Sequence, residues 1–375
     1  MKKLVKFSFE SDVISGGIRL KPNFLKSVDI INGAVLRAAF ANDILLDCPF
    51  SEETVDGKKY QVVSRGEKCS NCERRKICEK FSDMKFSFLY PENTIPAPFT
   101  SKTCKAHGTA HFVMDTVIEN GILRCQDCGG RMESLKGMIS KTDFSQVRVP
   151  HSISTHTAID ASTRTVKEGS LFSVDAVRKG CIYECEIDDC GTGMIYEGKI
   201  IYLGKYSSCG FGKMKIISVS DAADEDTGAR IEAFNSKFNK NENGKKYASV
   251  LLLSDAKLDI DKYADGIKTT DEYRNIWKKA VFGEESFIDI EQVTAQNYYY
   301  NGFDTSVEGE DYQHKAEYLT EKGTSFRISF PADSDYISVL EEIQKNGIGR
   351  DTECGFGKVS ICSDIHMRGI IKEGK

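Results

Sequence analysis

The pattern of hydrophobic and polar positions opens with a strand and a helix. Hydrophobic residues alternate with polar ones through residues 5–9, where Phe7 and Phe9 share one face of an extended chain. The run Gly-Ala-Val-Leu-Arg-Ala-Ala-Phe-Ala at 33–41 follows an Asn–Gly start and consists mostly of good helix formers. We therefore predict a strand at 5–9, a glycine-containing loop, and a helix near 32–43.

Short alternating segments return in the second half of the chain and predict further strands. Each segment is short and half apolar, as expected for strands with one buried face. The expected strands are 171–177, 181–187, 199–203, 214–219, 247–253, 325–330 and 359–362, with a helix near 336–345 before the last of them. This mixture of strands and helices predicts an α+β fold.

Residues 48–150 differ from the segments on either side. Their hydrophobic periodicity is poor, yet they hold seven of the chain's 13 cysteines, among turns and charged residues. Disulfides are disfavoured in a reducing compartment, so clustered cysteines indicate metal binding first. We predict an insertion that metal stabilises more than a hydrophobic core does.

An internal repeat divides the chain in two. Residues 202–216 and 347–361 share the pattern Gly-[Lys/Arg]-x-x-x-Cys-Gly-Phe-Gly-Lys, followed by a strand. Agreement at so many positions predicts two related α+β units, each closing with the same loop and strand. The expected domains are 1–215, which carries the insertion at about 48–150, and 216–375.

Composition and charge narrow the classes of function. With 40% hydrophobic and 29% charged residues the chain resembles a soluble globular protein, and it has no apolar run long enough to predict a membrane span. The N-terminus turns polar too soon for a signal peptide, so we expect a cytoplasmic protein. The net charge of −5 argues against a free-standing nucleic-acid binder, but not against a local basic surface in a larger assembly.

The two glycine loops are the strongest candidates for a nucleic-acid contact. Glycines let a partner chain approach closely, loop N–H groups favour phosphate oxygens, and basic neighbours add charge. The phenylalanines could stack on a base or fill the core. The candidates are Gly204, Lys205, Ser207, Gly210, Phe211, Gly212 and Lys213 in the first copy, and Gly349, Arg350, Gly355, Phe356, Gly357 and Lys358 in the second. The plainer alternative is a glycine-rich hairpin without a ligand, and neither copy matches the P-loop pattern of nucleotide hydrolases.

Other basic residues are weaker candidates for the same surface. Arg164 and Lys167 precede the strand at 171–177, where they could hold a phosphate or belong to a solvated hairpin tip. Arg37, in the first helix with Gly33, could contact RNA or only extend to the surface.

Cysteine spacing predicts at least one metal site. Cys125 and Cys128 stand in a Cys-x-x-Cys-Gly-Gly turn, which is typical of a zinc knuckle. Cys104 and His107 supply two further ligands, with His111 in reserve. Such a Cys3His set closes a structural tetrahedron around zinc.

A second cysteine cluster leaves the number of metal ions open. Cys69, Cys72 and Cys78 form another candidate site, whose fourth ligand could be Cys48. Alternatively, the two clusters share ligands around one ion. The spacings do not match the common iron–sulfur patterns, so we expect one or two structural zinc ions. No signature of a catalytic zinc site is present.

Several of these segments resemble RAMP proteins of type III CRISPR complexes. The segment Ile-Asn-Gly-Ala-Val-Leu-Arg-Ala at 31–38 is similar to the family's Ile-Pro-Gly-Ser-x-Leu-Arg-Gly element, and 160–172 to its segment that closes with Gly-x-Leu-Phe. Both glycine loops resemble the family's terminal loops, and Gly-Thr-Ser at 323–325 resembles its Gly-Ser before a late strand. The cysteine-rich zone from Pro98 to Cys128 is most similar to the type III-D RAMP subunit related to 5′-handle-binding subunits.

The resemblance implies a fold, a role and partners. It implies two RRM-like (ferredoxin-like) domains in a subunit that holds the 5′ handle of the crRNA. The subunit would contact the large polymerase-like CRISPR subunit and backbone RAMP subunits, and target RNA only indirectly. Backbone subunits cut target RNA with an acidic loop. The loop between Phe9 and the first helix of this chain lacks that feature, so the resemblance implies no enzymatic activity.

Two catalytic alternatives stay open at this point. One is a RAMP endoribonuclease that processes the guide precursor, with His151 or His156 as general base, although histidines beside loops are more often surface residues. The other is a backbone subunit that cuts target RNA through an aspartate such as Asp29 or Asp43.

Overall fold

The computed structural model describes most of the chain. The described residues are 2–16, 18–21, 23–46, 48, 52–55, 58–61, 63, 69–111, 113–118, 124–223, 226–238, 244–260, 269–301 and 316–367. They form two units: unit 1 contains Met1–Asn93 and Arg148–Ala222, and unit 2 contains Thr94–Val147, Ala223–Gly302 and His314–Lys375. Unit 1 therefore runs past the expected boundary at residue 215, and residues 94–147, expected as an insertion in the first domain, belong to unit 2.

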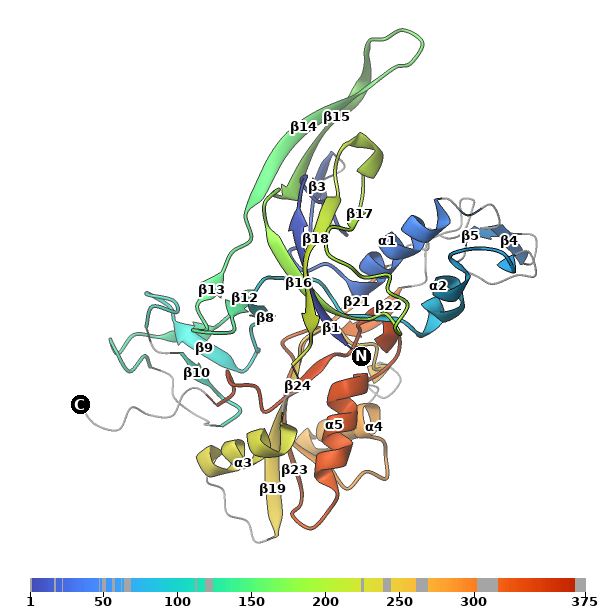
Figure 1. The fold of residues 1–375 in the computed structure, drawn as a ribbon. Coiled ribbons are helices and arrows are strands. Elements are labelled where there is room, and N and C mark those ends of the chain that lie inside the picture. The colour runs from blue at the N-terminus through green and yellow to red at the C-terminus, as the bar shows by residue number, and fades with distance from the viewer. Residues whose placement is uncertain are drawn as a thin grey trace. The chain divides into compact units, whose positions relative to one another are not determined.

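Unit 1 is built on an antiparallel sheet with β1 and β16 at its centre. The strand order is β17-β18-β1-β16-β6, and β7 also pairs with β16. The strands are β1 (Lys3–Phe9), β6 (Lys85–Phe86), β7 (Tyr90–Pro91), β16 (Ile182–Asp188), β17 (Ile200–Tyr202) and β18 (Lys213–Asp221) (Figure 1). The strands predicted at 5–9, 181–187, 199–203 and 214–219 are confirmed.

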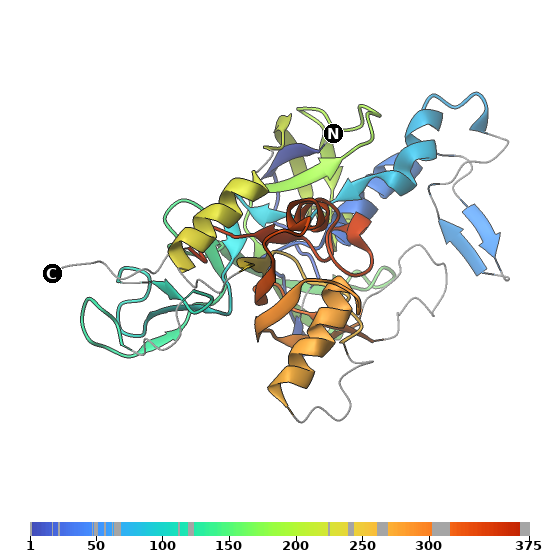
Figure 2. The ribbon, with the colours of Figure 1, turned by 90° about the horizontal axis from the view of Figure 1, so that it is seen from below.

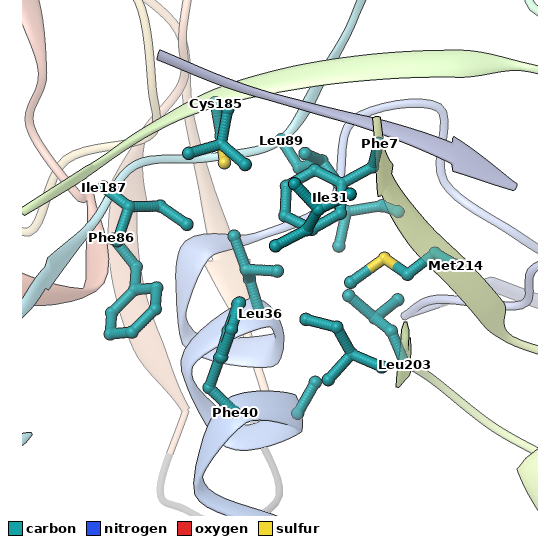
Figure 3. Close-up of a cluster of buried hydrophobic side chains, with 14 of the residues drawn as sticks. Phe7, Ile31, Leu36, Phe40, Phe86, Leu89, Cys185, Ile187, Leu203 and Met214 are labelled. Atoms are coloured by element: carbon teal, nitrogen blue, oxygen red, sulfur yellow. The ribbon is translucent and has the colours of Figure 1, made fainter. Parts of the chain in front are cut away.

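One helix covers the buried face of this sheet. Helix α1 (Gly33–Leu45) begins at Asn32, whose side-chain oxygen accepts a hydrogen bond from the Ala34 N–H at 2.8 Å. Leu36 of the helix and Phe7 of β1 are fully buried in the same cluster, which Figure 3 shows. Burial of this apolar face provides most of the stability of a helix of this length. The predicted first helix is confirmed.

A long β-hairpin forms the second sheet of unit 1. β14 (His151–Ile159) pairs with β15 (Val166–Val177), which runs parallel to β3 (Phe24–Lys26), and β2 (Ile18–Lys21) completes the sheet. Figure 1 shows β14 and β15 as one two-stranded ribbon that extends beyond β3. Only its base, 171–177, was predicted, because strand residues exposed on both faces carry little hydrophobic periodicity.

The cysteine-rich segment of unit 1 is short. Helix α2 (Arg75–Lys80) and the 3-10 turn η2 (Phe81–Asp83) lead into β6, and β4 (Glu52–Val55) pairs with β5 (Lys58–Gln61). Phe81 is buried in the same core as α1. Apolar packing therefore contributes to holding this segment, which the sequence predicted to depend mainly on metal.

Unit 2 contains a four-stranded antiparallel sheet with the order β20-β23-β19-β24. Its elements follow as α3 (Thr227–Phe238), β19 (Lys245–Leu252), α4 (Thr270–Phe282), β20 (Asp289–Thr294), β21 (Asn297–Tyr300), β22 (Glu317–Thr320), β23 (Ser325–Pro331), α5 (Tyr336–Asn346) and β24 (Val359–Ile361). Figure 2 shows the three helices in yellow, orange and red. The predicted strands at 247–253, 325–330 and 359–362 and the helix near 336–345 are confirmed.

Helix α4 was not predicted, although the sequence carries its start signal. The Thr269 hydroxyl accepts a hydrogen bond from the Glu272 N–H at 3.1 Å, and the Glu272 carboxylate accepts one from the Thr269 N–H at 3.1 Å. This reciprocal cap satisfies two N–H groups that a helix start leaves free. Trp277 of the same helix is fully buried in the core of unit 2. No helix among the described residues is long and apolar enough to cross a membrane.

The two main sheets share one strand order. Numbered within each unit, the strands lie fourth, first, third and second: β18-β1-β16-β6 in unit 1 and β24-β19-β23-β20 in unit 2. Unit 2 places α4 after its first strand and α5 after its third. Unit 1 places α1 after its first strand, and β17 occupies the described segment between β16 and β18.

The cysteine-rich segment of unit 2 consists of two small sheets. Their orders are β10-β9-β11 and β13-β12-β8. The strands are β8 (Thr94–Pro96), β9 (Ser101–Cys104), β10 (Met114–Asp115), β11 (Met132–Ser134), β12 (Met138–Ser140) and β13 (Gln146–Val147). The N–H of Phe99 donates to the carbonyl of Gly323 at 2.8 Å, which ties the segment to the turn before β23.

Candidate nucleic-acid interface and metal site

The repeated sequence folds into the same loop twice. We call residues 204–213 loop 1 and residues 349–358 loop 2. The third residue of each adopts the left-handed conformation, with φ of 59° at Tyr206 and 58° at Asp351. A single 3-10 turn and a left-handed glycine follow in both loops. The repeat predicted from the sequence is therefore also a structural repeat.

Glycines allow the end of each loop to pack against the residue that precedes the loop. A Cβ atom at Gly212 would clash with the carbonyl oxygen of Leu203, and one at Gly357 with that of Ile348. The same pairs are hydrogen bonded: the Leu203 N–H donates to the Gly212 carbonyl, and the Ile348 N–H to the Gly357 carbonyl, both at 2.9 Å. Only glycine fits where main chains approach so closely, so chain closure explains part of the glycine pattern.

The turn that follows β1 holds loop 1. We call residues 11–14 the unit 1 turn. The Asp12 carbonyl accepts a hydrogen bond from the Gly212 N–H at 2.8 Å, and the Ser11 hydroxyl oxygen accepts one from the Lys213 N–H at 2.9 Å. These bonds fix the end of loop 1 beside the first strand. No motif in the sequence indicates this turn.

The turn that follows β19 holds loop 2 in the same way. The Asp255 carbonyl accepts a hydrogen bond from the Gly357 N–H at 2.8 Å, and the Ser254 hydroxyl oxygen accepts one from the Lys358 N–H at 2.8 Å. A Ser-Asp pair thus recurs after the first strand of each unit. Two residues are too short a match to be noticed in the sequence alone.

The side chains of the two aspartates extend the correspondence. One Asp12 carboxylate oxygen accepts a hydrogen bond from the Lys179 N–H at 2.8 Å, and one Asp255 oxygen accepts one from the Lys322 N–H at 2.9 Å. Each lysine lies in the turn before the third strand of its unit. Each aspartate therefore joins three segments: the turn after the first strand, the turn before the third, and the glycine loop.

The two loops differ in charge. In unit 2, the Arg350 guanidinium lies 2.7 Å from Asp259, and the Lys257 ammonium lies 2.6 Å from Glu317 and 2.5 Å from Asp351. Burial acts to lower the pKa of Lys257, but the hydrogen bonds to Asp351 and Glu317 outweigh it and raise that pKa above its usual value. The positive charge beside loop 2 is thus compensated within the unit.

Loop 1 is more open. Residues 204–210 are all exposed, whereas among the equivalent residues of loop 2 only 349 and 350 are exposed, 351–354 are half-buried and 355 is buried. Lys205 is exposed, and no described residue forms an ion pair with it, while Lys213 lies 3.4 Å from Glu10. Phe211 is half-buried and Phe356 is buried, so Phe356 fills the core, one of the two roles considered for these rings.

The residues of the first helix serve the core. Gly33 is the buried first residue of α1. The Arg37 guanidinium donates hydrogen bonds to the carbonyls of Met84 and Phe81 at 2.7 and 3.0 Å, and it lies over the Phe81 ring at 4.7 Å. Its donors therefore fasten α1 to the segment before β6, a contact that the sequence did not suggest.

Arg164 and Lys167 lie at the far end of the β14–β15 hairpin. Both are exposed, and Arg164 has a positive φ of 57° in the turn between the strands. Hydrogen bonds from Ser162 and Thr163 lower the pKa of the Asp160 carboxyl, in the same turn, to about 2. The two basic residues thus belong to a hairpin tip, apart from loop 1.

His151 lies between two carboxylates at the base of this hairpin. Its Nδ1 is 2.7 Å from an Asp175 oxygen and its Nε2 is 2.8 Å from an Asp29 oxygen. Both ring nitrogens therefore have partners within the unit.

The other residues considered for catalysis are also engaged. The Nε2 of His156 lies 2.8 Å from the Ser154 hydroxyl oxygen. The Asp43 carboxylate forms an ion pair with the Lys199 ammonium at 2.8 Å. These contacts stabilise the hairpin and the end of α1, respectively.

Four cysteine and histidine side chains in unit 2 form a candidate metal site. The ligand atoms of Cys104, His111, Cys125 and Cys128 all lie within 4.8 Å of one another. A zinc tetrahedron with bonds of about 2.3 Å to sulfur and 2.0 Å to nitrogen has sulfur–sulfur edges of about 3.8 Å and sulfur–nitrogen edges of about 3.5 Å. The sulfur atoms of Cys104 and Cys128 are 3.7 Å apart, and Nδ1 of His111 is 3.7 Å from the Cys125 sulfur. The residues fit a tetrahedral metal ion.

The structure includes His111, the reserve ligand, where the sequence favoured His107. The Nδ1 of His107 lies 3.6 Å from the Cys104 sulfur and 3.9 Å from the Cys128 sulfur, and its ring stacks on that of His111 at 3.9 Å. The spacing could not decide between them, because the loop after Cys104 brings both rings to the thiols.

The Cys125–Cys128 turn favours the thiolate of Cys125. A backbone hydrogen bond at Gly130 acts to lower the pKa of Cys128, but burial and the neighbouring Cys104 and Cys125 thiols outweigh it and raise that pKa. The Gly129 N–H donates to the Cys125 carbonyl at 2.8 Å, and the Cys125 N–H to the Gly130 carbonyl at 2.7 Å. Burial acts to raise the pKa of Cys125, but hydrogen bonds from the backbone at Cys128 and Asp127 lower it to about 6. The thiolate, which is the form that binds metal, is therefore favoured near neutral pH.

The second cysteine cluster is less well assembled. Burial and then Cys72, Cys48 and Cys69 raise the pKa of the Cys78 thiol. The part of the chain that the structure describes nevertheless contains one set of close metal-ligand atoms, the set in unit 2.

The described residues thus define an α+β protein with antiparallel sheets, a duplicated glycine loop and a Cys3His cluster. No family model matches its sequence, and no curated protein matches it either.

Among solved structures, the chain is similar to one in type III-B Cmr-beta bound to cognate target RNA, with 15% identity over 95% of this chain and 96% of that one and a TM-score of 0.47. A similar chain, in type III-B Cmr-beta bound to cognate target RNA and AMPPnP, gives 15% identity over 93% and 90% and a TM-score of 0.46. A chain of a type IV-B CRISPR complex gives 11% identity over 60% and 92% and a TM-score of 0.29. TM-scores below 0.5 do not establish a common fold.

We expect Gly212→Ala to destabilise the protein much more than Gly210→Ala. Both glycines have positive φ, 77° and 92°, but only at Gly212 would a Cβ meet main chain, since nothing lies within 4 Å of one at Gly210. Gly210→Ala should cost about 1 kcal/mol for the left-handed backbone alone, and Gly212→Ala roughly 3 kcal/mol or more. Chemical denaturation of both variants measures this, and equal losses would contradict the observed loop closure.

We expect Cys125→Ser to reduce bound metal from about one ion per chain to almost none. The midpoint of thermal unfolding should fall by about 5 °C or more, because a structural metal stabilises the folded state. Metal analysis and thermal unfolding measure both effects. Cys209→Ser, at an exposed cysteine of loop 1, is the control and should change neither.

The same measurements separate the two histidines. His111→Ala should lose the metal, and His107→Ala should retain most of it, because the close set of donor atoms contains His111. The reverse result would make His107 the fourth ligand.

Proposed function

We propose that this chain is a non-catalytic RNA-binding subunit of a type III, III-D-like CRISPR ribonucleoprotein that acts in antiviral defence. The observation that carries the proposal is the duplicated glycine loop with its basic residues, held by the same Ser-Asp turn beside the first strand of each unit. Loops of this kind suit an RNA backbone, because they combine close approach, main-chain donors and positive charge.

The proposed fold is a pair of RRM-like, ferredoxin-like domains with a zinc-binding insertion. The β-α-β-β-α-β order of unit 2 and its strand order, fourth, first, third and second, are those of a ferredoxin-like unit. Unit 1 has the same strand order with one of the two helices. RRM-type folds are used for single-stranded RNA, which is the form of a crRNA handle.

Loop 1 is the better candidate for the RNA contact. Lys205 is exposed beside main chain that is open to solvent, whereas Arg350 and Lys257 at loop 2 are already paired with carboxylates. A phosphate at loop 2 would have to displace these carboxylates. A phosphate at loop 1 would pair with the Lys205 ammonium without displacing a carboxylate.

The proposed partners follow from the resemblance to RAMP proteins. They are the 5′ handle of the crRNA, the large polymerase-like subunit and the backbone RAMP subunits, with target RNA contacted only indirectly. The net charge of −5 supports a subunit role, because an acidic protein with a local basic surface suits an assembly better than free nucleic-acid binding.

The proposed metal is one structural zinc ion, held by Cys104, His111, Cys125 and Cys128. Three thiolates and one imidazole are a closed structural set for zinc, with no position left for water or substrate. In this role the ion adds to the small buried cluster that Met114 and Met132 form with Cys104 and Cys125 around β9.

The proposal includes no chemical step. His151 has carboxylates at both ring nitrogens, and Asp43 is paired with Lys199. We therefore expect the purified chain not to cleave a CRISPR repeat RNA, with or without divalent metal. Gel analysis of the RNA tests this, with His151→Ala and His156→Ala as matched variants. Metal-independent cleavage that either variant abolishes would favour the endoribonuclease alternative.

We expect Lys205→Gln to weaken binding of a single-stranded repeat RNA about threefold to fivefold at low salt, the effect of losing one phosphate contact. The plot of log affinity against log salt concentration should become less steep, with its negative slope smaller in magnitude by about 0.7. Arg350→Gln is the control: because its charge is compensated by Asp259, affinity should change little. Titration by fluorescence anisotropy measures both, and equal losses in the two variants would contradict the preference for loop 1.

A further inference from the structure

Four aromatic rings gather where loop 1 meets the hairpin of unit 1. His156 of β14 stacks on Phe172 of β15 with ring centroids 5.5 Å apart, and Phe211 of loop 1 approaches His156 edge-on at 5.7 Å. Tyr206 lies 5.9 Å from Phe172 and 6.5 Å from Phe211. The first three rings are half-buried, whereas Tyr206 is 41% exposed. Phe172 and Phe211 therefore pack against the Tyr206 ring and leave part of it open to solvent.

The backbone at Tyr206 is strained. Its φ of 59° and ψ of 29° place it in the left-handed region, which bulky side chains rarely adopt. The equivalent residue of loop 2 is Asp351, with φ of 58°, and aspartate tolerates this conformation much better. The same loop thus forms with a residue better suited to it, so the tyrosine is not needed for the turn. A bulky residue in a strained, exposed position points to a binding role.

The surroundings of the ring are polar and basic. Lys205 and Ser207, its neighbours along the chain, are both exposed, and no described residue forms an ion pair with Lys205. In unit 2, Phe356, which is the counterpart of Phe211, is buried, and the Lys257 ammonium lies over its ring at 4.9 Å. The residue of unit 1 that corresponds to Lys257 is Ile14. The Ile14 carbonyl accepts a hydrogen bond from the Lys205 N–H at 2.8 Å, and the Lys257 carbonyl accepts one from the Arg350 N–H at 3.1 Å. Loop 1 therefore lacks the internal cation that occupies loop 2.

We propose that Tyr206 stacks on an unpaired base of bound RNA, with Lys205 at the adjoining phosphate. An exposed aromatic ring beside a free cation matches a single-stranded nucleotide, since the base offers a flat apolar face and the phosphate a negative charge. Phe172 and Phe211 support the ring from behind, so little side-chain freedom is lost when a base binds. The inference rests on the proposed function, because it names the residue at which the RNA-binding surface contacts a base.

The test uses three variants of the full chain. Tyr206→Gly removes the ring and also relieves the left-handed backbone, so the thermal midpoint should stay the same or rise. Its affinity for a short single-stranded repeat RNA should nevertheless fall roughly 5-fold to 100-fold, the effect of losing one stacked base. Tyr206→Phe should bind as the wild type does. Tyr299→Ala, at a 72% exposed tyrosine of β21, is the control and should leave affinity unchanged.

Photo-crosslinking adds a direct readout. The same RNA, carrying 5-iodouridine at one position after another, should crosslink to Tyr206 at one position. Normal affinity of Tyr206→Gly, with no crosslink at Tyr206, would overturn the stacking role while leaving RNA binding intact, and would point to a protein partner for the exposed ring. Failure of the wild-type chain to bind any RNA would overturn the proposed function and this inference together.

Discussion

Main-chain hydrogen bonds between each glycine loop and the turn after the first strand are the constraint on which the candidate interface depends. In unit 1 the Asp12 carbonyl and the Ser11 hydroxyl hold Gly212 and Lys213. The loop also approaches this turn at Gly204, where a Cβ atom would clash with the Ile14 carbonyl oxygen, so glycine is required at that position. The loop is therefore rigid at its base, and its exposed middle, residues 205–210, is presented on a fixed support.

The same support occurs in both units, but the charges beside it have diverged. Unit 2 carries Lys257 where unit 1 carries Ile14, and carboxylates surround that lysine. These carboxylates compensate the charge of Lys257 and leave little of it for a ligand. Unit 1 leaves Lys205 exposed next to Tyr206. One duplicated loop thus fits a structural role and the other a binding role.

Local patterns in the sequence predicted the features that depend on neighbouring residues. The strand at β1, helix α1, the repeat and the Cys125–Cys128 turn all depend on spacing within a few residues. The partners of these features come from distant segments, and the spacing could not reveal them. The Ser11-Asp12 turn meets a loop some two hundred residues later in the chain, and residues 94–147 belong to unit 2 through contacts such as Phe99 with Gly323. The choice between His107 and His111 likewise depends on the path of a loop.

Hydrogen–deuterium exchange of the full chain, with and without single-stranded repeat RNA, tests the central claim most directly. Exchange at exposed loop amides slows when a ligand covers them. The account predicts protection of residues 204–213 by RNA, with the equivalent residues 349–358 unchanged because their charges are already compensated. Protection of loop 2 alone, or of neither loop, would contradict it.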